Sequence, residues 1–194
     1  MQRISLVNVA HNLINEVLHP GDIAIDATVG NGYDTLFLAK QVGSSGEVFG
    51  FDIQEDAIES TKEKFRQTNC PACLTLTHAS HADMSDKIPF RHHGNIRAIM
   101  FNLGYLPGGD KCIITRTDST ITALNSACRM LSGNGIITVL AYPGHQGGDL
   151  ETDQVKSWCE QLDKVQFKIS IVYSSDCKDS APRIFVIKRA LLNK

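Results

Sequence analysis

The feature that most constrains the fold is a short apolar run that ends in an acidic residue and then turns through two glycines. Residues 23–29 read Ile-Ala-Ile-Asp-Ala-Thr-Val, and Gly30 and Gly32 follow before an amphipathic segment from Thr35 to Val42. The run predicts a buried strand and the later segment a helix. Such a turn directs backbone N–H groups and a helix N-terminus at one place. Glycine lets a ligand lie against the backbone there, although a G-x-G alone also fits a tight turn without a ligand.

The next predicted strand strengthens the ligand interpretation. Residues 47–54 are mostly apolar, and Asp52 lies 20 positions after Gly32. A carboxylate at the tip of the second strand of a βαβ unit accepts hydrogen bonds from a ribose diol. The alternative is that Asp52 caps the helix that begins near Glu55. Because spacing, strand context and position agree, we favour the ribose role and therefore a nucleoside cofactor.

Length and composition predict one globular domain over residues 1–194, because 42% of the chain is hydrophobic and it has no linker. No run of about 18 apolar residues could span a membrane. Residues 1–5 lack the profile of a signal peptide, so we expect a cytoplasmic protein. Of six cysteines, Cys70 and Cys73 form a CxxC without a second pair, which favours structural thiols over a zinc site.

The formal net charge of −2 is not that of a polycation that binds nucleic acid indiscriminately. A local basic rim could still hold RNA. The basic candidates are a cluster around Arg91 and Arg97, the pair Lys111 and Arg116, and Lys188 with Arg189. Each of them, taken alone, also fits ordinary solvated surface charge.

The hydrophobic patterns predict a helix over residues 4–18 and then five strand–helix units. The remaining strands are expected at residues 74–77, 96–103, 136–141, 167–173 and 183–188, and the remaining helices at 55–68, 117–131 and 150–162. The last two strands are joined by about nine residues, too few for a parallel crossover, so they should form an antiparallel pair. This α/β order leaves no room for the second parallel half of a dehydrogenase.

Polar residues follow the predicted strands where a ligand crevice is expected. Asn102 ends the fourth strand and precedes a loop rich in glycine, which should be a shaped loop rather than a hairpin because period-two alternation is missing. His81 follows the third strand and is a candidate cofactor contact or an exposed loop histidine. His11 lies on the first helix, where we expect a surface histidine.

Together these motifs resemble class I S-adenosylmethionine-dependent methyltransferases, and more narrowly the small bacterial family known as putative rRNA methylases. That family includes an enzyme that N-methylates 5-aminomethyl-2-thiouridine at the tRNA wobble position. The resemblance covers nearly the whole chain and is carried by Asp26-Ala-Thr-Val-Gly-Asn-Gly32, Phe51-Asp-Ile-Gln54, Asn102-Leu-Gly-Tyr-Leu-Pro-Gly-Gly-Asp-Lys111 and Tyr142-Pro-Gly-His145. The run 102–111 is long and specific. Tyr33 departs from the pattern, which has histidine there.

The resemblance implies a doubly wound, Rossmann-like sheet of seven strands in the order 3-2-1-4-5-7-6, with an antiparallel last strand and helices on both faces. It implies S-adenosylmethionine as the cofactor, RNA such as a tRNA anticodon region as the partner, and a chain that could act as a homodimer. The cofactor-binding residues would be Asp26, Thr28, Gly30, Asn31, Gly32, Asp34, Thr35, Asp52, Ile53, Gln54, Ser80, His81 and Asn102. The substrate-binding residues would be Leu103, Gly104, Tyr105, Lys111, Arg116, Tyr142 and His145.

Methyl transfer from a sulfonium is an in-line displacement that needs an aligned, uncharged nucleophile. Asn102 is the first catalytic candidate, because its side-chain oxygen could accept an amine N–H and orient the lone pair. Backbone carbonyls of Leu103 and Gly104 could do the same. Tyr105, the second candidate, could stack on a base, and Lys111 and Arg116 could hold phosphate.

Other functions stay open at the level of sequence. Within enzymes, the substrate could be a ribosomal RNA base or a small-molecule amine. A catalytically silent S-adenosylmethionine-binding module that scaffolds a partner would not need the 102–111 run. A nicotinamide-binding module is disfavoured, because Thr35 stands where the third glycine of G-x-G-x-x-G would be.

Overall fold

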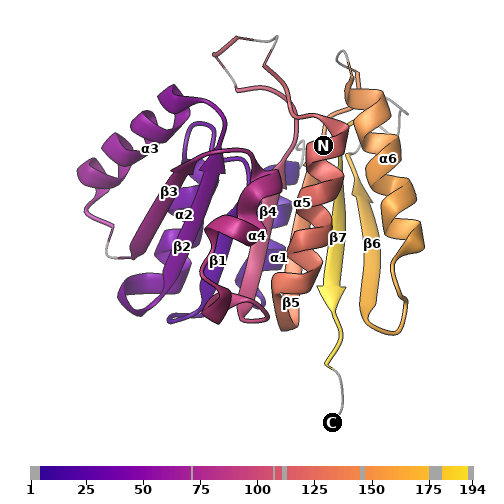
Figure 1. Cartoon of the computed structure of the whole chain (residues 1–194), viewed down its shortest axis with the longest axis horizontal. Coiled ribbons are helices and arrows are strands. Elements are labelled where there is room, and N and C mark those ends of the chain that lie inside the picture. Colours follow the sequence, from indigo (N-terminus) through magenta and orange to yellow (C-terminus); the bar gives the residue numbers. More distant parts are fainter. Residues whose placement is uncertain are drawn as a thin grey trace.

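The computed structural model describes residues 5–70, 72–106, 108–110, 113–144, 147–174 and 181–191. Within them a seven-stranded sheet has the order β3-β2-β1-β4-β5-β7-β6 (Figure 1). The strands are β1 (Ile23–Asp26), β2 (Glu47–Asp52), β3 (Cys73–His78), β4 (Ile96–Asn102), β5 (Leu131–Ala141), β6 (Phe167–Tyr173) and β7 (Arg183–Arg189). The first five run parallel, and β7 pairs antiparallel with both β5 and β6. The expected order and the antiparallel ending are confirmed.

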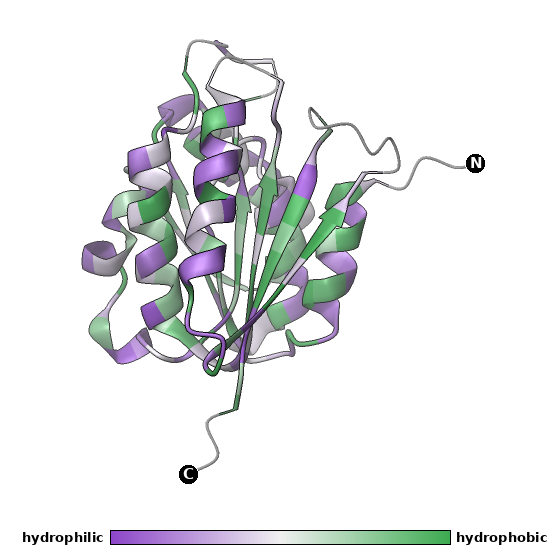
Figure 2. Cartoon of the chain, turned by 90° about the vertical axis from the view of Figure 1, so that its right-hand side faces the viewer, coloured by the Kyte–Doolittle hydropathy of each residue, from purple (hydrophilic) through white to green (hydrophobic). Residues whose placement is uncertain are grey.

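Helices cover both faces of the sheet, as predicted (Figures 1 and 2). The helices are α1 (Leu6–Asn15), α2 (Tyr33–Val42), α3 (Glu55–Thr68), α4 (Met84–Lys87), α5 (Thr117–Met130) and α6 (Gly148–Gln161). Apolar residues of α1 and α2, among them Ile14 and Leu38, pack in one buried cluster, and those of α5 and α6, among them Leu124 and Val155, pack in another. The central strands lie between the two layers and are buried on both faces, which is why they read as nearly continuous apolar runs. None of the helices in the described ranges has the length and apolar character of a membrane span.

Two parts of the chain differ from the sequence expectation. Strand β5 begins at Leu131 rather than Ile136, because Leu131 pairs with Ile96 and Ile136 with Ala98 on β4. The residues between them bulge out, and Asn134 has a positive φ of 60°. The second difference is a series of short helices between β3 and β4, at His81–Asp83, Met84–Lys87 and Phe90–His92. Elements this short carry too few residues to show a helical period.

The parallel strands all end at the upper edge of the sheet in Figure 1, where the turns after β1, β2, β3, β4 and β5 gather. The described residues directly after β4 continue upward from this edge in Figure 1. Ligands of open α/β sheets bind at the carboxyl ends of the strands, near the point where the strand order reverses. In this sheet that point lies between β1 and β4.

Candidate active site

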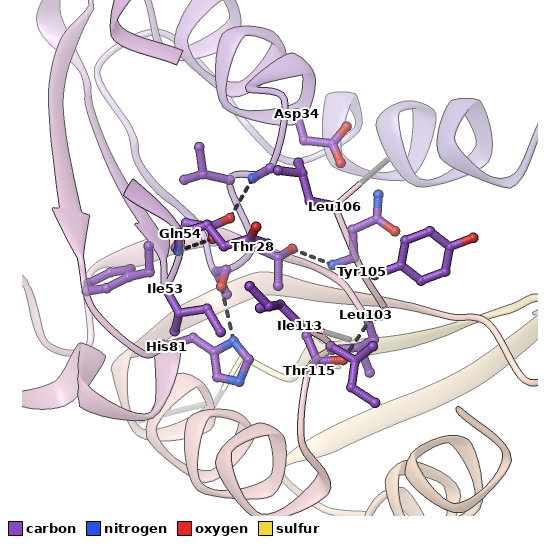
Figure 3. A pocket seen from close by; sticks show the side chains of 18 of the residues that line it. Thr28, Asp34, Ile53, Gln54, His81, Leu103, Tyr105, Leu106, Ile113 and Thr115 are labelled. Carbon is purple, nitrogen blue, oxygen red and sulfur yellow. Dashed lines mark hydrogen bonds between the residues drawn. The ribbon is translucent and has the colours of Figure 1, made fainter. Parts of the chain in front are cut away.

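A cavity of about 810 Å³ opens at this edge of the sheet, within the size range of about 300–1,000 Å³ that is usual for small-molecule sites. Its walls come from α1, the glycine turn, the ends of β2 and β3, and the loops that follow β4 and β5. Figure 3 shows Ile53, Gln54 and His81 on one side of the cavity and Tyr105 on the other, with Thr28 between them. One cavity therefore joins the predicted cofactor residues to the predicted acceptor residues.

The glycine turn is held from below by Asp26. Its buried carboxylate accepts the Thr35 hydroxyl at 2.6 Å and the backbone N–H of Thr28 at 3.1 Å. Burial, followed by the charge of Asp34, raises the pKa of Asp26 to about 7. Gly32 starts α2 with a φ of 74°, and a Cβ there would come within 2.8 Å of Thr61 Cγ2. The turn thus needs glycine at this position for packing as well as for its backbone conformation.

Asp52 ties the tip of β2 to the glycine turn. Its two oxygens accept backbone N–H groups, one from Gly30 at 2.8 Å and the other from Gln54 at 2.9 Å. The carboxylate is partly exposed and lines the cavity. Each carboxylate oxygen can accept more than one hydrogen bond, so both remain able to accept a diol from the cavity side. The N-cap of α3 is Gln54, so Asp52 does not cap this helix and instead accepts the N–H of the residue that precedes it.

His81 forms the wall on the β3 side. Its Nδ1 lies 3.2 Å from the carbonyl oxygen of Ala27. Because a carbonyl only accepts, Nδ1 must carry the proton, which leaves Nε2 of the neutral ring as an acceptor. Within the described residues this buried Nε2 has no hydrogen-bond partner. Burial, the largest effect, lowers the pKa of His81 and keeps the ring neutral. The predicted contacts Ile53, Gln54 and Ser80 line the same side.

Asp34 lies near the α1 side of the cavity. Its Oδ1 is 2.7 Å from Nε2 of His11, and the imidazole of His11 stacks on Phe37 with ring centroids 3.8 Å apart. The surface histidine expected at position 11 is therefore a partly buried partner of a cavity residue. Tyr142 lines the cavity too, and burial together with the charge of Asp34 raises the pKa of its hydroxyl to about 12. Tyr142 thus stays protonated at neutral pH and can donate a hydrogen bond.

Asn102 reaches the cavity from the end of β4, and its backbone N–H donates to the Thr28 hydroxyl at 2.7 Å. The loop that follows differs from the expected shape, because its two ends pair like the base of a hairpin. Thr115 donates its N–H to the Gly104 carbonyl at 2.8 Å, and Tyr105 forms an antiparallel bridge with Ile114. One lone pair of the Gly104 carbonyl, a proposed amine acceptor, is thereby used. Tyr105 is 39% exposed at the rim.

Most predicted site residues come together around the cavity. Those that line it are Thr28, Gly30, Asn31, Asp34, Asp52, Ile53, Gln54, Ser80, His81, Asn102, Leu103, Gly104, Tyr105, Arg116 and Tyr142. Asp26, Gly32 and Thr35 lie beneath the turn rather than on the wall, so a direct cofactor contact by them stays a prediction. Lys111 and His145 lie outside the described residues.

The sequence analysis missed several residues of the site. Val7, Leu106, Ile113 and Thr115 line the cavity, and Tyr33 stands exposed at its edge with Lys64 Nζ 3.5 Å from its ring centroid. The amphipathic first helix predicted that Val7 faces inward but not toward a ligand. Thr115 carried no signal, because its role comes from contacts with distant residues.

The known proteins to which the chain is similar are described as methylases or methyltransferases. Residues 48–188 match the family described as "Putative rRNA methylase". The chain is 41% identical over 164 residues to "tRNA (mnm(5)s(2)U34)-methyltransferase, chloroplastic" of Arabidopsis thaliana. This alignment covers 80% of this chain and 59% of the length of the plant protein. A crystal structure of a putative rRNA-methylase from Clostridium thermocellum has a TM-score of 0.90 at 36% identity and covers 97% of this chain and 100% of that one. A putative methyltransferase from Streptococcus mutans in complex with SAH has a TM-score of 0.84 at 31% identity, with 96% and 98% covered.

Proposed function

The chain belongs to the putative rRNA methylase family of S-adenosylmethionine-dependent methyltransferases, and on this premise we propose that it N-methylates the 5-aminomethyl group of a 2-thiouridine at the wobble position of tRNA. The observation that carries the choice of substrate is the similarity to the plant tRNA (mnm(5)s(2)U34)-methyltransferase. The cavity supports it, because its two walls suit a nucleoside cofactor and an RNA base. The cofactor wall consists of the glycine turn, residues 52–54 and His81, and the acceptor wall of Asn102, Tyr105 and Arg116.

The cofactor wall fits S-adenosylmethionine in several respects. A Cβ on Gly30, whose φ is 50°, would come within 3.5 Å of Leu106 Cδ1 and so reduce the space beside the turn. Asp52 would accept the ribose hydroxyls through the lone pairs that its backbone contacts leave. The neutral ring of His81, held by its contact with the Ala27 carbonyl, closes the same side of the cavity. Ile53, 51% exposed, offers an apolar surface to the adenine ring.

When bound, S-adenosylmethionine supplies a methyl group on a sulfonium centre. The chain's own residues must hold the acceptor amine in line and keep its lone pair free. Asn102 would accept an N–H of the neutral amine through its side-chain oxygen. The bond from its backbone N–H to Thr28 holds the residue at the edge of the cavity. Leu103 and Leu106 give that wall an apolar surface, which disfavours the protonated amine.

The acceptor wall has features suited to RNA. Tyr105 offers an exposed ring at the rim on which a base could stack. Arg116, also exposed, lines the same cavity and could contact a phosphate. Tyr142 would add a hydroxyl donor for the base edge. Lys111 and His145 belong to the same proposal by their place in the sequence.

Mass spectrometry of tRNA nucleosides from a deletion strain tests the proposal. We expect the methylaminomethyl-thiouridine nucleoside to disappear, the aminomethyl precursor to accumulate, and the wild-type chain to restore the product. The purified chain should methylate tRNA from that strain but not its ribosomal RNA. An unchanged tRNA nucleoside profile with loss of a methylated ribosomal base would overturn the tRNA substrate in favour of rRNA. Tight cofactor binding without any methylated product would instead indicate a silent module.

A further inference from the structure

A buried carboxylate outside the cavity wall is connected to the loop that carries the acceptor residues. Glu151 lies in the first turn of α6 and is 3% exposed. Its Oε2 accepts the Thr115 hydroxyl at 2.7 Å and its Oε1 accepts the Thr120 hydroxyl, also at 2.7 Å. Among the residues that the structure describes, no cation is paired with this carboxylate.

The surroundings explain how such a carboxylate can be buried. Thr120 lies in the first turn of α5 and Glu151 in the first turn of α6, so the amino ends of both helices face this group. The partial positive charge at helix amino ends stabilises an anion there. Hydrogen bonds to both oxygens further offset the loss of hydration.

The hydrogen bonds that lead from Glu151 to the loop have a fixed direction. A carboxylate only accepts hydrogen bonds, so the Thr115 hydroxyl must be the donor to Glu151. Its oxygen is then left to accept the backbone N–H of Gly104, at 2.9 Å. Thr115 also donates its own N–H to the Gly104 carbonyl at 2.8 Å. Both backbone groups of Gly104 are therefore bound to Thr115, and Thr115 is bound to Glu151.

We infer that Glu151 is a positioning residue, which sets through Thr115 the conformation of the acceptor loop, defined here as residues 103–106 and 113–116. Gly104 lies two positions after Asn102 and directly before Tyr105, and both of these residues line the cavity. The loop base is otherwise tied to the sheet by the Leu103 N–H, which donates to the Leu140 carbonyl at 2.9 Å. Loss of the Glu151 contact would free the base of the loop on its outer side and misplace the acceptor groups.

The inference rests on the proposed function only where it says that the loop carries acceptor groups. The contacts between Glu151, Thr115 and Gly104 do not depend on the substrate. The chain offers a matched pair of variants for the test. Thr115→Val and Thr120→Val each remove one hydroxyl from the same carboxylate while keeping the side-chain shape. Only the first one also removes the acceptor of the Gly104 N–H.

The first measurement is hydrogen–deuterium exchange of the Gly104 amide in cofactor-free protein. We expect Thr115→Val to raise its exchange rate about 3- to 10-fold, the loss of one hydrogen bond, and Glu151→Gln to raise it as well. Thr120→Val should leave it near the wild-type value, and Thr115→Ser should restore it. If Glu151→Gln or Thr115→Val exchanges like wild type, or if Thr120→Val raises the rate equally, the inference is wrong.

The second measurement separates kcat from cofactor affinity on deletion-strain tRNA. Thr115→Val should lower kcat about 3- to 10-fold, with the dissociation constant for S-adenosylmethionine unchanged, and Thr120→Val should lower neither. Equal kcat values in all variants would overturn the positioning role. If wild type methylates no RNA, the proposed function fails, whereas the exchange measurement still decides whether Glu151 orders the loop.

Discussion

The two walls of the cavity are held in place by different kinds of contact. Most contacts of the cofactor wall lie inside one βαβ unit, formed by β1, α2 and β2, in which Asp26 accepts from Thr28 and Asp52 accepts from Gly30 and Gln54. His81, which reaches Ala27 from 54 positions away, is added to this unit from outside. The acceptor wall is fixed by Thr115 binding to Glu151, 36 positions away. The first wall is thus determined by a local motif and the second by the packing of α6 against the rest of the fold.

This difference suits what each wall has to do. A cofactor common to many methyltransferases can be held by a short, rigid strand–turn–helix unit whose backbone groups are already in place. An acceptor differs between enzymes, and a loop positioned by a rigid scaffold can change without disturbing the sheet. The comparison predicts that variants of the cofactor wall affect stability and cofactor binding, whereas variants of the acceptor wall affect turnover.

The largest effect should come from Gly32→Ala, which puts a side chain into the glycine turn of the cofactor wall. A non-glycine residue at a φ of 74° costs about 1–2 kcal/mol. The new Cβ would also meet Thr61, 2.8 Å from its Cγ2, and such overpacking costs about 1–3 kcal/mol more. We expect the free energy of unfolding, measured with urea, to fall by about 2–5 kcal/mol.

Gly94→Ala is the matched control for this variant. Gly94 also has a positive φ, of 80°, but an added Cβ would meet no atom within 4 Å. It should therefore lose only the backbone part, about 1–2 kcal/mol. Equal losses in the two variants would show that the contact with Thr61 does not constrain the turn.

The second prediction concerns the acceptor wall. Asn102→Ala removes the amide that would orient the amine, and loss of one such group lowers kcat by roughly 100-fold. Cofactor affinity and stability should change little, because the backbone N–H of residue 102 still donates to Thr28. Asn95→Ala, just before the opposite end of β4, is the control and should keep wild-type turnover. Normal turnover in Asn102→Ala would refute the catalytic role.

The third prediction returns to the cofactor wall. Asp52→Ala should weaken S-adenosylmethionine binding about 10- to 100-fold in calorimetry, since hydrogen bonds to a charged group contribute about 1.5–3 kcal/mol. It also leaves the Gly30 N–H without its acceptor. Asp22→Ala is the control, because Asp22 likewise accepts a backbone N–H, from His19 at 2.8 Å, but lies before the start of β1. Unchanged affinity in Asp52→Ala would contradict the ribose contact.

Much of the fold could be predicted from the sequence because buried parallel strands are short apolar runs that need no partner to be recognised. Strand β4 and helix α3 were expected within one residue of their observed ends. The start of β5 was not predicted, because the sequence from Ser132 to Gly135 is typical of a turn. These residues belong to the strand only because the residues on both sides of them pair with β4. The full strand order came from the family resemblance and not from the pattern alone.

The candidate site divides in the same way. Asp52 and the glycine turn were predicted from spacing, because a βαβ unit places the ends of its two neighbouring strands side by side. The Thr115–Glu151 contact could not be predicted, since no local pattern pairs a loop threonine with a helix 36 residues later. Likewise His11 was expected at the surface, because nothing in its own helix showed that Asp34 would lie 2.7 Å away.

The smallest effect should be a pH dependence from His81, and it sharpens the comparison because it belongs to the cofactor wall alone. Burial lowers the pKa of His81 in the folded protein below that of an unfolded histidine. Below about pH 6.5 the unfolded chain therefore takes up a proton that the folded chain does not. Stability that is present at pH 7.5 is then lost as the pH falls, by at most about 1.4 kcal/mol per pH unit.

His81→Asn isolates this contribution, because asparagine can still donate to the Ala27 carbonyl but does not titrate. Urea unfolding of both proteins between pH 5 and pH 7.5 should show a steeper loss of stability in wild type toward acid pH. The raised pKa of Asp26 acts in the opposite direction, since its folded form holds a proton more tightly, but it is present in both proteins and cancels in the difference. Parallel curves would mean that His81 is as free to take up a proton in the fold as outside it. The cofactor wall would then be less closed to water than its contacts indicate.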